Sequence, residues 1–288
     1  MKFKIGFSAD KYEHEDTTPA HIAIPEEPKP VRSVVQIHFP ARNMTLSYYN
    51  DQFNLHRGDL VFVDGKLEGK RGRVVDVAYN FKIKVSDYKR VIAVADTNVT
   101  GELHLAGSHF VAFEPTTMPY EKVITWFKPP VKEDDEYISG QDDSSFLLED
   151  LGGMGASNAV GERGHEYYMS NKVVYICLDG EHGRAIVEGS EPYELEFEYK
   201  NGEISHLTCN CFCSYPCKHE VAAMLQLRET LDLIEKNYAA QYERSNYFAA
   251  ISKGAFLNFV MDGKETGSFM MNGPAERGEE KMLLSAAL

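Results

Sequence analysis

The sequence lacks the features that mark membrane, secreted and nucleotide-hydrolysing proteins. Its 288 residues contain no apolar run near the ~20 residues that a transmembrane helix needs. Basic residues open the chain, but Ser8, Asp10 and Lys11 interrupt the apolar stretch that a secretory signal requires. No Gly-x-x-x-x-Gly-Lys-Ser/Thr segment is present to cradle phosphate groups. We therefore expect a cytoplasmic protein with no membrane partner, no evident small-molecule substrate and no nucleotide-hydrolysing motor.

Positive charge is in short supply. The chain has 30 Lys and Arg residues against 44 Asp and Glu, a net charge of -14, which by itself opposes binding to nucleic acid. The charge is unevenly distributed, however. Residues 133–166 hold ten acidic residues and one basic residue, whereas residues 57–90 hold nine basic residues and five acidic ones. The sequence therefore contains a mildly basic patch and a strongly acidic connecting stretch.

Cysteine is also scarce, with five residues in all, but four of them lie between positions 209 and 217. Disulfides do not persist in a reducing compartment, where tight clusters of Cys and His are more often metal sites. The fifth, Cys177, lies in the apolar run Val173–Leu178 and is expected to be a core residue. The cysteine pattern therefore predicts a metal site.

Cys209, Cys211, Cys217 and His219 follow the pattern Cys-x-Cys-x5-Cys-x-His. A structural Zn²⁺ takes four such ligands in a tetrahedron, and four protein ligands leave no position for a substrate. We therefore expect a structural zinc site and no enzymatic activity. Cys213 would lie on the same face as Cys209 and Cys211 if the strand continued, so it is an alternative ligand in place of Cys209.

The residues around this cluster predict a strand hairpin and a helix. Tyr193–Tyr199 alternates apolar and acidic residues, an Asn-Gly turn follows, and Ile204–Thr208 forms a second strand. Apolar residues recur at helical spacing from Glu220 onward. The chain is thus expected to form a strand, a turn, a second strand, a metal-binding loop and a helix.

This segment resembles the SWIM-type zinc finger over about 45 residues, from Arg184 to Leu227. The resemblance implies a ββα unit with bound Zn²⁺ that contacts DNA or protein. It also favours Cys209 over Cys213 as a ligand, because the five-residue loop matches the family. Members often have proline after the second cysteine, where this chain has Phe212 and then Cys213.

Residues 57–74 resemble a KOW motif, with Gly58-Asp59, alternating valines and a turn rich in glycine and lysine. The resemblance implies an SH3-like barrel and contact with RNA or ribosomal partners. The candidate nucleic-acid contacts in this motif and beside the finger's histidine are Lys66, Lys70, Arg71, Arg73 and Lys218. The alternative is a plain barrel turn with solvated charges.

The expected fold class is α+β. Four prolines among charged residues predict a loosely ordered arm over 1–30, and short β-branched runs predict a small β-barrel-like domain over 31–130, with a helix at 119–127. An acidic, glycine-containing linker is expected over 131–166. The expected divisions after it are the ββα zinc-finger domain over 167–245 and a C-terminal helical segment over 246–288.

Within the linker, Phe146-Leu147-Leu148 is expected to dock locally, with a partner-binding motif as the alternative. Three functions are compatible with the whole pattern. The first is a non-enzymatic zinc-binding module that contacts nucleic acid or protein. The second is a structural or adaptor subunit of a helicase- or RNA-associated complex without direct nucleic-acid contact. The third, a zinc-dependent enzyme, is disfavoured because it needs an open coordination position.

Overall fold

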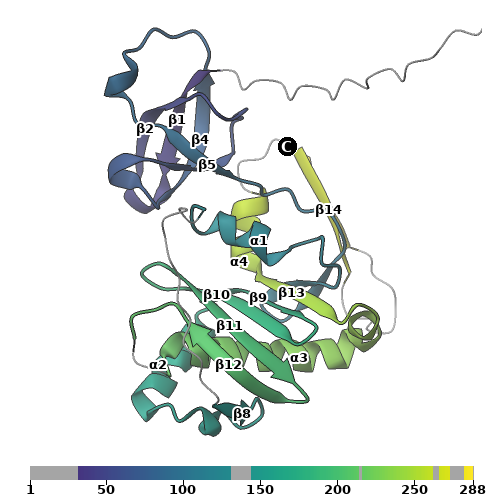
Figure 1. Ribbon diagram of the computed structural model, residues 1–288. Coiled ribbons are helices and arrows are strands. Elements are labelled where there is room, and N and C mark those ends of the chain that lie inside the picture. Colours follow the sequence, from purple (N-terminus) through teal and green to yellow (C-terminus); the bar gives the residue numbers. More distant parts are fainter. Residues whose placement is uncertain (1–31, 131–143, 214–215, 262–265, 273–281, 288) are drawn as a thin grey trace, which may run out of the picture.

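The computed structural model describes residues 32–130, 144–213, 216–261, 266–272 and 282–287, which form two β-sheets and several helices (Figure 1). The arm predicted over 1–30 lies outside the described residues. The first sheet has the strand order β2-β1-β4-β3-β5. Its strands are β1 (Ser33–Phe39), β2 (Met44–Asn50), β3 (Leu60–Val63), β4 (Arg71–Ala78) and β5 (Val91–Ala95).

The five-stranded sheet buries one face through alternation of its side chains. In β1, Val35, Ile37 and Phe39 are buried. The residues that alternate with them, at positions 34, 36 and 38, are partly exposed. Gly72 on the neighbouring β4 is required by this packing, because a Cβ there would lie 2.2 Å from Ile37. Together with Val61 and Val74 these residues belong to the core of the first sheet.

The described part of this sheet is not a closed barrel, so the barrel prediction was wrong in that respect. Among the described residues, backbone pairing between the two edges of the sheet is limited to an isolated bridge between Tyr49 near the end of β2 and Arg90, the residue before β5. Asn50 explains why the pairing stops there. Its side-chain amide donates to the Phe53 carbonyl at 2.7 Å, and its side-chain oxygen accepts from the Phe53 N–H at 3.1 Å, which turns the chain away from β5.

The second sheet has ten strands in the order β15-β14-β6-β7-β13-β9-β10-β11-β12-β8. All of its neighbouring strands are antiparallel except β14 and β6, which are parallel. The strands are β6 (Leu103–Ala106), β7 (His109–Ala112), β8 (Ser145–Leu147), β9 (Val173–Asp179), β10 (His182–Glu188), β11 (Pro192–Lys200), β12 (Glu203–Cys209), β13 (Tyr247–Ser252), β14 (Thr266–Asn272) and β15 (Met282–Ala287).

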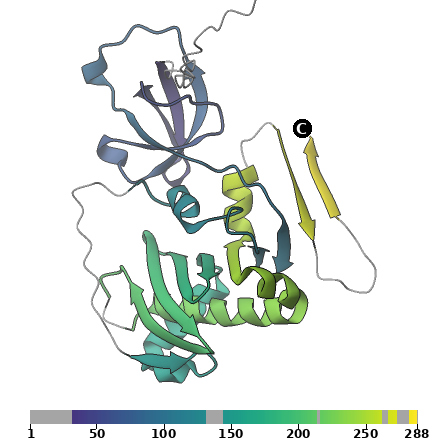
Figure 2. The same cartoon turned by 45° about the vertical axis from the view of Figure 1, so that its right-hand side comes forward.

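Helices cover both faces of this sheet. The helices are α1 (Tyr120–Val123), α2 (Asn158–Met169), α3 (Lys218–Ser245) and α4 (Lys253–Phe256), with a π-helical turn at Leu257–Met261. Figure 2 shows α3 running across one face. The central strand β9 is buried on both faces, since Ile176 packs in the α3 cluster and Tyr175 packs with Trp126 and Phe256 on the other side. This explains its unbroken apolar sequence, and it confirms Cys177 as a core residue.

The hairpin and both predicted helices are confirmed. β11 pairs antiparallel with β12 across the turn at Asn201 and Gly202, both of which have positive φ. The helix expected at 119–127 appears as α1 followed by a 3-10 turn at Ile124–Trp126. The helix expected from Glu220 begins two residues earlier, at Lys218.

Residues 144–166 are not linker, in contrast to the prediction. β8 pairs with β12 so that Phe146 lies opposite Ile204, which confirms local docking of the apolar triplet. α2 packs on α3, and Gly164 permits the approach because a Cβ there would lie 2.5 Å from Val221. The acidic side chains and Gly152, Gly153 and Gly155 of this stretch are exposed, whereas Gly164 is buried between α2 and α3. Residues 131–143 lie outside the described part of the chain.

Residues from 246 onward also differ from the predicted helical segment. Tyr247–Ser252 forms β13 in the middle of the ten-stranded sheet, paired with β7 and β9. Every residue of β13 is buried, and a short, fully buried apolar run has no periodicity that separates a strand from a helix. Because β7 belongs to this sheet, the segment predicted as one domain over 31–130 contributes strands to both sheets.

Candidate metal centre and the adjoining groove

The end of β12 and the start of α3 bring three cysteines and one histidine together. The ligand atoms of Cys209, Cys211, Cys217 and His219 all lie within 4.8 Å of one another. Cys217 and His219 are buried, and the other two cysteines are partly buried. Cys213 is exposed and does not belong to this group. The structure thus assembles the four residues that the sequence favoured.

A capping box fixes the start of α3. Cys217 is the N-cap, and its side chain accepts from the backbone N–H of Glu220, while the Glu220 carboxylate accepts from the backbone N–H of Cys217 at 2.6 Å. Burial raises the pKa of Glu220 to about 8. Both residues of the box are buried, so the box fixes the position of the Cys217 thiol at the start of α3.

The imidazole of His219 is oriented by its neighbours. Its Nδ1 lies 3.8 Å from the sulfur of Cys209 and 3.8 Å from that of Cys217. The ring stacks on Tyr193, with centroids 4.1 Å apart, and meets the edge of Tyr167 at 5.5 Å. Nδ1 therefore faces the sulfurs and is the ring nitrogen placed to bind a metal.

The β10–β11 turn packs directly on this histidine. A Cβ at Gly189 would lie 2.8 Å from the Tyr193 ring and 3.5 Å from Nε2 of His219, so only glycine fits beneath the stacked rings. Nε2 is buried and has no hydrogen-bond partner among the described residues. A ring held this closely cannot rotate to present Nε2 to the sulfurs. Nδ1 is therefore the ring nitrogen that would bind the metal.

The three thiols of the cluster differ in the direction in which their pKa is shifted. The pKa of Cys217 is lowered to about 3, chiefly because the Cys209 thiol donates a hydrogen bond to its thiolate, and His219 contributes in the same direction. The same hydrogen bond raises the pKa of Cys209, and burial raises the pKa of Cys211 to about 11. Crowded, partly buried thiols retain protons that a divalent cation can displace, so the cluster is suited to a metal ion. Three sulfurs and one imidazole nitrogen are a donor set that zinc accepts.

The five candidate nucleic-acid contacts fall into two groups. Lys66 and Lys70 are exposed. Arg71, Arg73 and Lys218 are engaged with the protein instead: Arg73 donates to the Gly58 carbonyl at 2.9 Å, and the Lys218 ammonium lies 4.3 Å from the centre of the Tyr167 ring. Arg73 also donates to the Asn258 carbonyl at 2.7 Å. Only the two exposed lysines in this set are placed to contact a polyanion.

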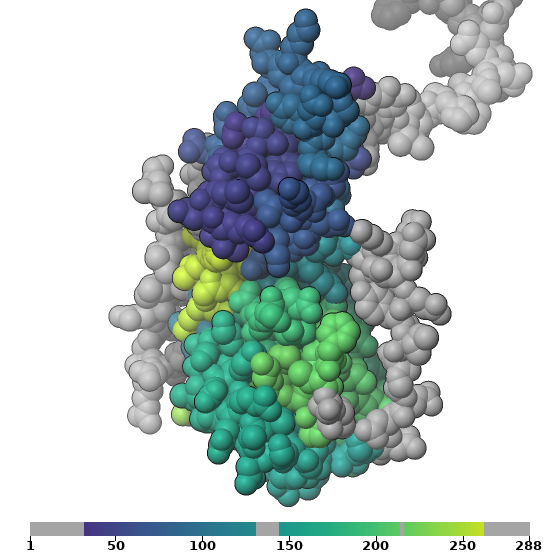
Figure 3. Space-filling view, turned by 90° about the vertical axis from the view of Figure 1, so that its left-hand side faces the viewer, coloured from purple at the N-terminus to yellow at the C-terminus, as the bar shows by residue number. Residues whose placement is uncertain are grey.

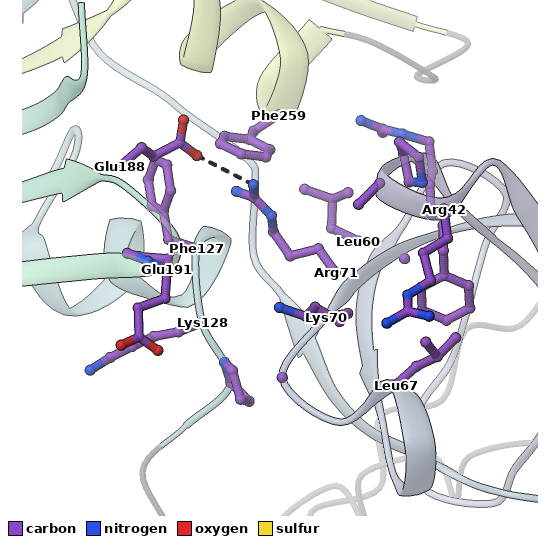
Figure 4. A pocket seen from close by; sticks show the side chains of 18 of the residues that line it. Arg42, Leu60, Leu67, Lys70, Arg71, Phe127, Lys128, Glu188, Glu191 and Phe259 are labelled. Carbon is purple, nitrogen blue, oxygen red and sulfur yellow. Dashed lines mark hydrogen bonds and ion pairs between the residues drawn. The ribbon is translucent and has the colours of Figure 1, made fainter. Parts of the chain in front are cut away.

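Arg71 joins the two sheets at their junction. It forms an ion pair with Glu188 at 3.3 Å (Figure 4), and its guanidinium also donates to the Trp126 carbonyl at 3.2 Å. The guanidinium carbon lies 4.7 Å from the centre of the Phe259 ring and 5.5 Å from that of Phe127. Because Arg71 lies at the start of β4 and its partners lie on the other sheet and its helices, the contact fixes one sheet against the other.

Replacing Arg71 by alanine is expected to lower the free energy of unfolding by about 2 kcal/mol, since it removes two charge-assisted contacts and the packing of the guanidinium against two aromatic rings. Urea denaturation measures the change. The matched control is Lys70→Ala at the preceding, exposed position, for which we expect a change within about 0.5 kcal/mol. Equal effects of the two substitutions would contradict a joining role for Arg71.

A groove of about 660 Å³ lies beside this junction. Figure 3 shows the unit of the five-stranded sheet (purple to blue) resting on the second unit (green), and Figure 4 shows the groove from close by. One side is formed by residues 39–42 and 67–73, and the other by residues 127–129 and 188–192. Sequence reasoning missed this groove because its basic residues, such as Arg42, Lys128 and Lys172, are far apart in the chain and belong to no motif.

Within the described residues, no helix combines the length and apolar character that crossing a membrane requires. Among the described residues, the Cys/His cluster and the groove are the two features whose side chains are arranged to bind a ligand. Comparison with known proteins adds no assignment to either. No protein-family model, curated protein or solved structure matches this chain.

Proposed function

We propose that this protein is a non-enzymatic binding module whose folding depends on one structural zinc ion, held by Cys209, Cys211, Cys217 and His219. The observation that carries the proposal is the convergence of three thiols and one imidazole nitrogen within 4.8 Å. Four protein donors complete a tetrahedral site and leave no position for a substrate or an activated water. The resemblance of residues 184–227 to the SWIM-type finger supports the same ligand set.

Nucleic acid is the partner that we favour. Both family resemblances imply such a partner, and the exposed Lys66 and Lys70 are available to phosphate groups. The outer face of the metal-site hairpin is not a suitable contact surface, because Glu194, Glu196 and Glu198 line it. The phosphate contacts therefore belong on a surface other than this hairpin.

A protein partner is the alternative, and Phe212 favours it. This side chain is 100% exposed and lies in the loop between Cys211 and Cys217. Large aromatic side chains that project from a fixed loop are common anchors in protein interfaces. In this alternative the zinc ion holds the loop, Phe212 enters a pocket of the partner, and the protein acts as an adaptor without direct nucleic-acid contact.

Metal analysis and X-ray absorption test the zinc site. We expect one zinc per chain in the pure, reduced protein, bound by three sulfurs and one nitrogen at about 2.0–2.3 Å. An oxygen donor from water in place of one sulfur would instead favour the zinc-dependent enzyme, because catalytic zinc sites keep an open position. Protein without bound metal would overturn the proposal.

Binding assays decide the partner class. If nucleic acid is the partner, the logarithm of the affinity for DNA or RNA oligonucleotides is expected to fall linearly with the logarithm of salt concentration, so that the affinity falls by at least tenfold between about 50 and 200 mM. Phe212→Ala is expected to leave that affinity within about twofold. Co-purification of a protein that resists nuclease and is lost with Phe212→Ala would favour the protein-docking alternative instead.

A further inference from the structure

We propose that the groove between the two sheets binds the phosphate backbone of single-stranded nucleic acid. This inference rests on the proposed function for the class of partner, but it places the contacts in a site that neither family resemblance indicates. The groove is lined by six basic side chains, from Arg42, Lys70, Arg71, Arg73, Lys128 and Lys172, and by the carboxylates of Glu68, Glu188 and Glu191. Its lining thus has three more basic than acidic groups in a chain of net charge -14.

The basic residues of the groove divide by their contacts. Arg71 is bound to Glu188, and Lys128 is bound to Glu194, so these two groups hold the walls together. Arg42, Lys70 and Lys172 are exposed, and none of them has an ion-pair or side-chain hydrogen-bond partner among the described residues. Three cations without partners beside one concavity repel one another, and a polyanion relieves that repulsion.

These three cations lie on both sides of the groove. Arg42 ends the short turn after β1, Lys70 precedes β4, and Lys172 precedes β9 in the second sheet. Figure 4 shows Lys70 and Arg42 on the side of the five-stranded sheet, and Lys128 and Glu191 on the opposite side of the opening. A chain lying along the groove would therefore meet positive groups from both sheets.

The shape of the groove favours a single strand over a duplex. Proteins read duplex DNA by inserting a helix or a strand ribbon into its grooves, so their contact surface projects. Here the cations surround a cavity of about 660 Å³, which has the size of a pocket for one small ligand. The apolar lining residues Leu60, Leu67 and Phe39 are buried, so the exposed groups that a strand can meet are chiefly the cations, which contact its phosphates. A positively charged groove that follows the phosphate backbone is a common feature of single-strand binding.

The metal centre supports one wall of this groove. Glu188, Gly189, Ser190 and Glu191 belong to the lining, and Gly189 lies against the stacked rings of Tyr193 and His219. A fixed His219 therefore fixes the β10–β11 turn, which in turn positions Glu188 for Arg71. The zinc ligands thus have a positioning effect on the groove, although none of them faces the bound strand.

The test removes the three cations without partners. Fluorescence anisotropy with labelled dT and rU strands of ~20 nucleotides at about 50 mM salt measures binding by the full chain with its zinc. The variant Arg42→Gln/Lys70→Gln/Lys172→Gln is expected to bind at least tenfold more weakly, and its salt slope is expected to fall by about 2, since each single-strand phosphate contact contributes about 0.7. The matched control, Lys82→Gln/Lys84→Gln/Lys236→Gln, removes three exposed cations outside the groove and is expected to stay within about threefold.

The possible failures can be told apart. If the unaltered protein binds strands and the groove variant binds equally well, the groove proposal is overturned, while nucleic-acid binding by the module stands. Binding that is tighter to duplex than to single strands also overturns it. If inorganic phosphate or a mononucleotide displaces the strand at equal phosphate concentration, the groove is a small-anion site and the strand proposal is wrong. If no strand binds but one zinc per chain is present, both the groove and the nucleic-acid partner are rejected, and only the zinc site remains.

Discussion

Cys217→Ser is expected to abolish tight zinc binding and to lower the free energy of unfolding by about 4 kcal/mol or more. A metal ion that binds the folded chain at 1,000 times its dissociation constant contributes about that much to stability. Serine is also a good helix N-cap, so the capping box with Glu220 can persist in the variant. The loss therefore reports the missing thiolate and not the missing cap.

Zinc content after dialysis and urea denaturation with and without a chelator measure this effect. The matched control is Cys213→Ser, which changes an exposed cysteine outside the cluster and is expected to leave both values unchanged. If Cys213→Ser loses the metal and Cys209→Ser keeps it, the alternative ligand set with Cys213 is correct. If the chelator leaves the stability of the unaltered protein unchanged, zinc has no structural role here.

The metal cluster could be predicted from sequence because its residues are nearly contiguous. Eleven residues, 209–219, contain all four candidate ligands, and the flanking hairpin and helix have strong periodicities of their own. Local patterns of this kind need no knowledge of tertiary contacts. The roles of Tyr193 and Gly189 were not predicted, since their value lies in stacking on a histidine more than 25 residues away.

The errors have a common physical origin in long-range packing. Residues from 246 onward were expected as helix because Phe248, Ile251, Phe256, Phe259 and Val260 form an apolar periodic run, but β13 is a fully buried strand whose sequence lacks a period of two. Residues 144–166 were expected as linker because glycine and acidic side chains dominate, yet Gly164 is what lets α2 approach α3. Arg71 was expected to face nucleic acid, but it packs against two phenylalanine rings contributed by distant segments. In each case a partner remote in sequence decided the outcome.

Stability is expected to fall as the pH drops below about 6.5, and His109 on β7 is expected to cause much of the fall. This ring is fully buried between Ser108 and the Val173 carbonyl, to which its Nε2–H donates at 2.8 Å. Burial lowers its pKa from 6.5 to about 4, and the nearby Lys253 acts in the same direction. Between these two values the unfolded chain takes up a proton that the folded chain refuses, so acid favours unfolding.

The shift of the His109 pKa corresponds to about 3 kcal/mol over the whole interval, of which about 2 kcal/mol is lost between about pH 7 and about pH 5. His109→Gln keeps an N–H that can donate to Val173 but cannot titrate. We therefore expect its free energy of unfolding to fall by about 2 kcal/mol less than that of the unaltered protein over the same range. Urea denaturation at both pH values measures this difference, and any acid loss of metal affects both proteins alike.

The control is His56→Gln, because the side chain of His56 is 70% exposed. This variant is expected to show the same pH dependence as the unaltered protein. If His109→Gln shows the same pH dependence as the unaltered protein, the loss of stability in acid comes from protonation of other groups and not from the buried, neutral ring of His109.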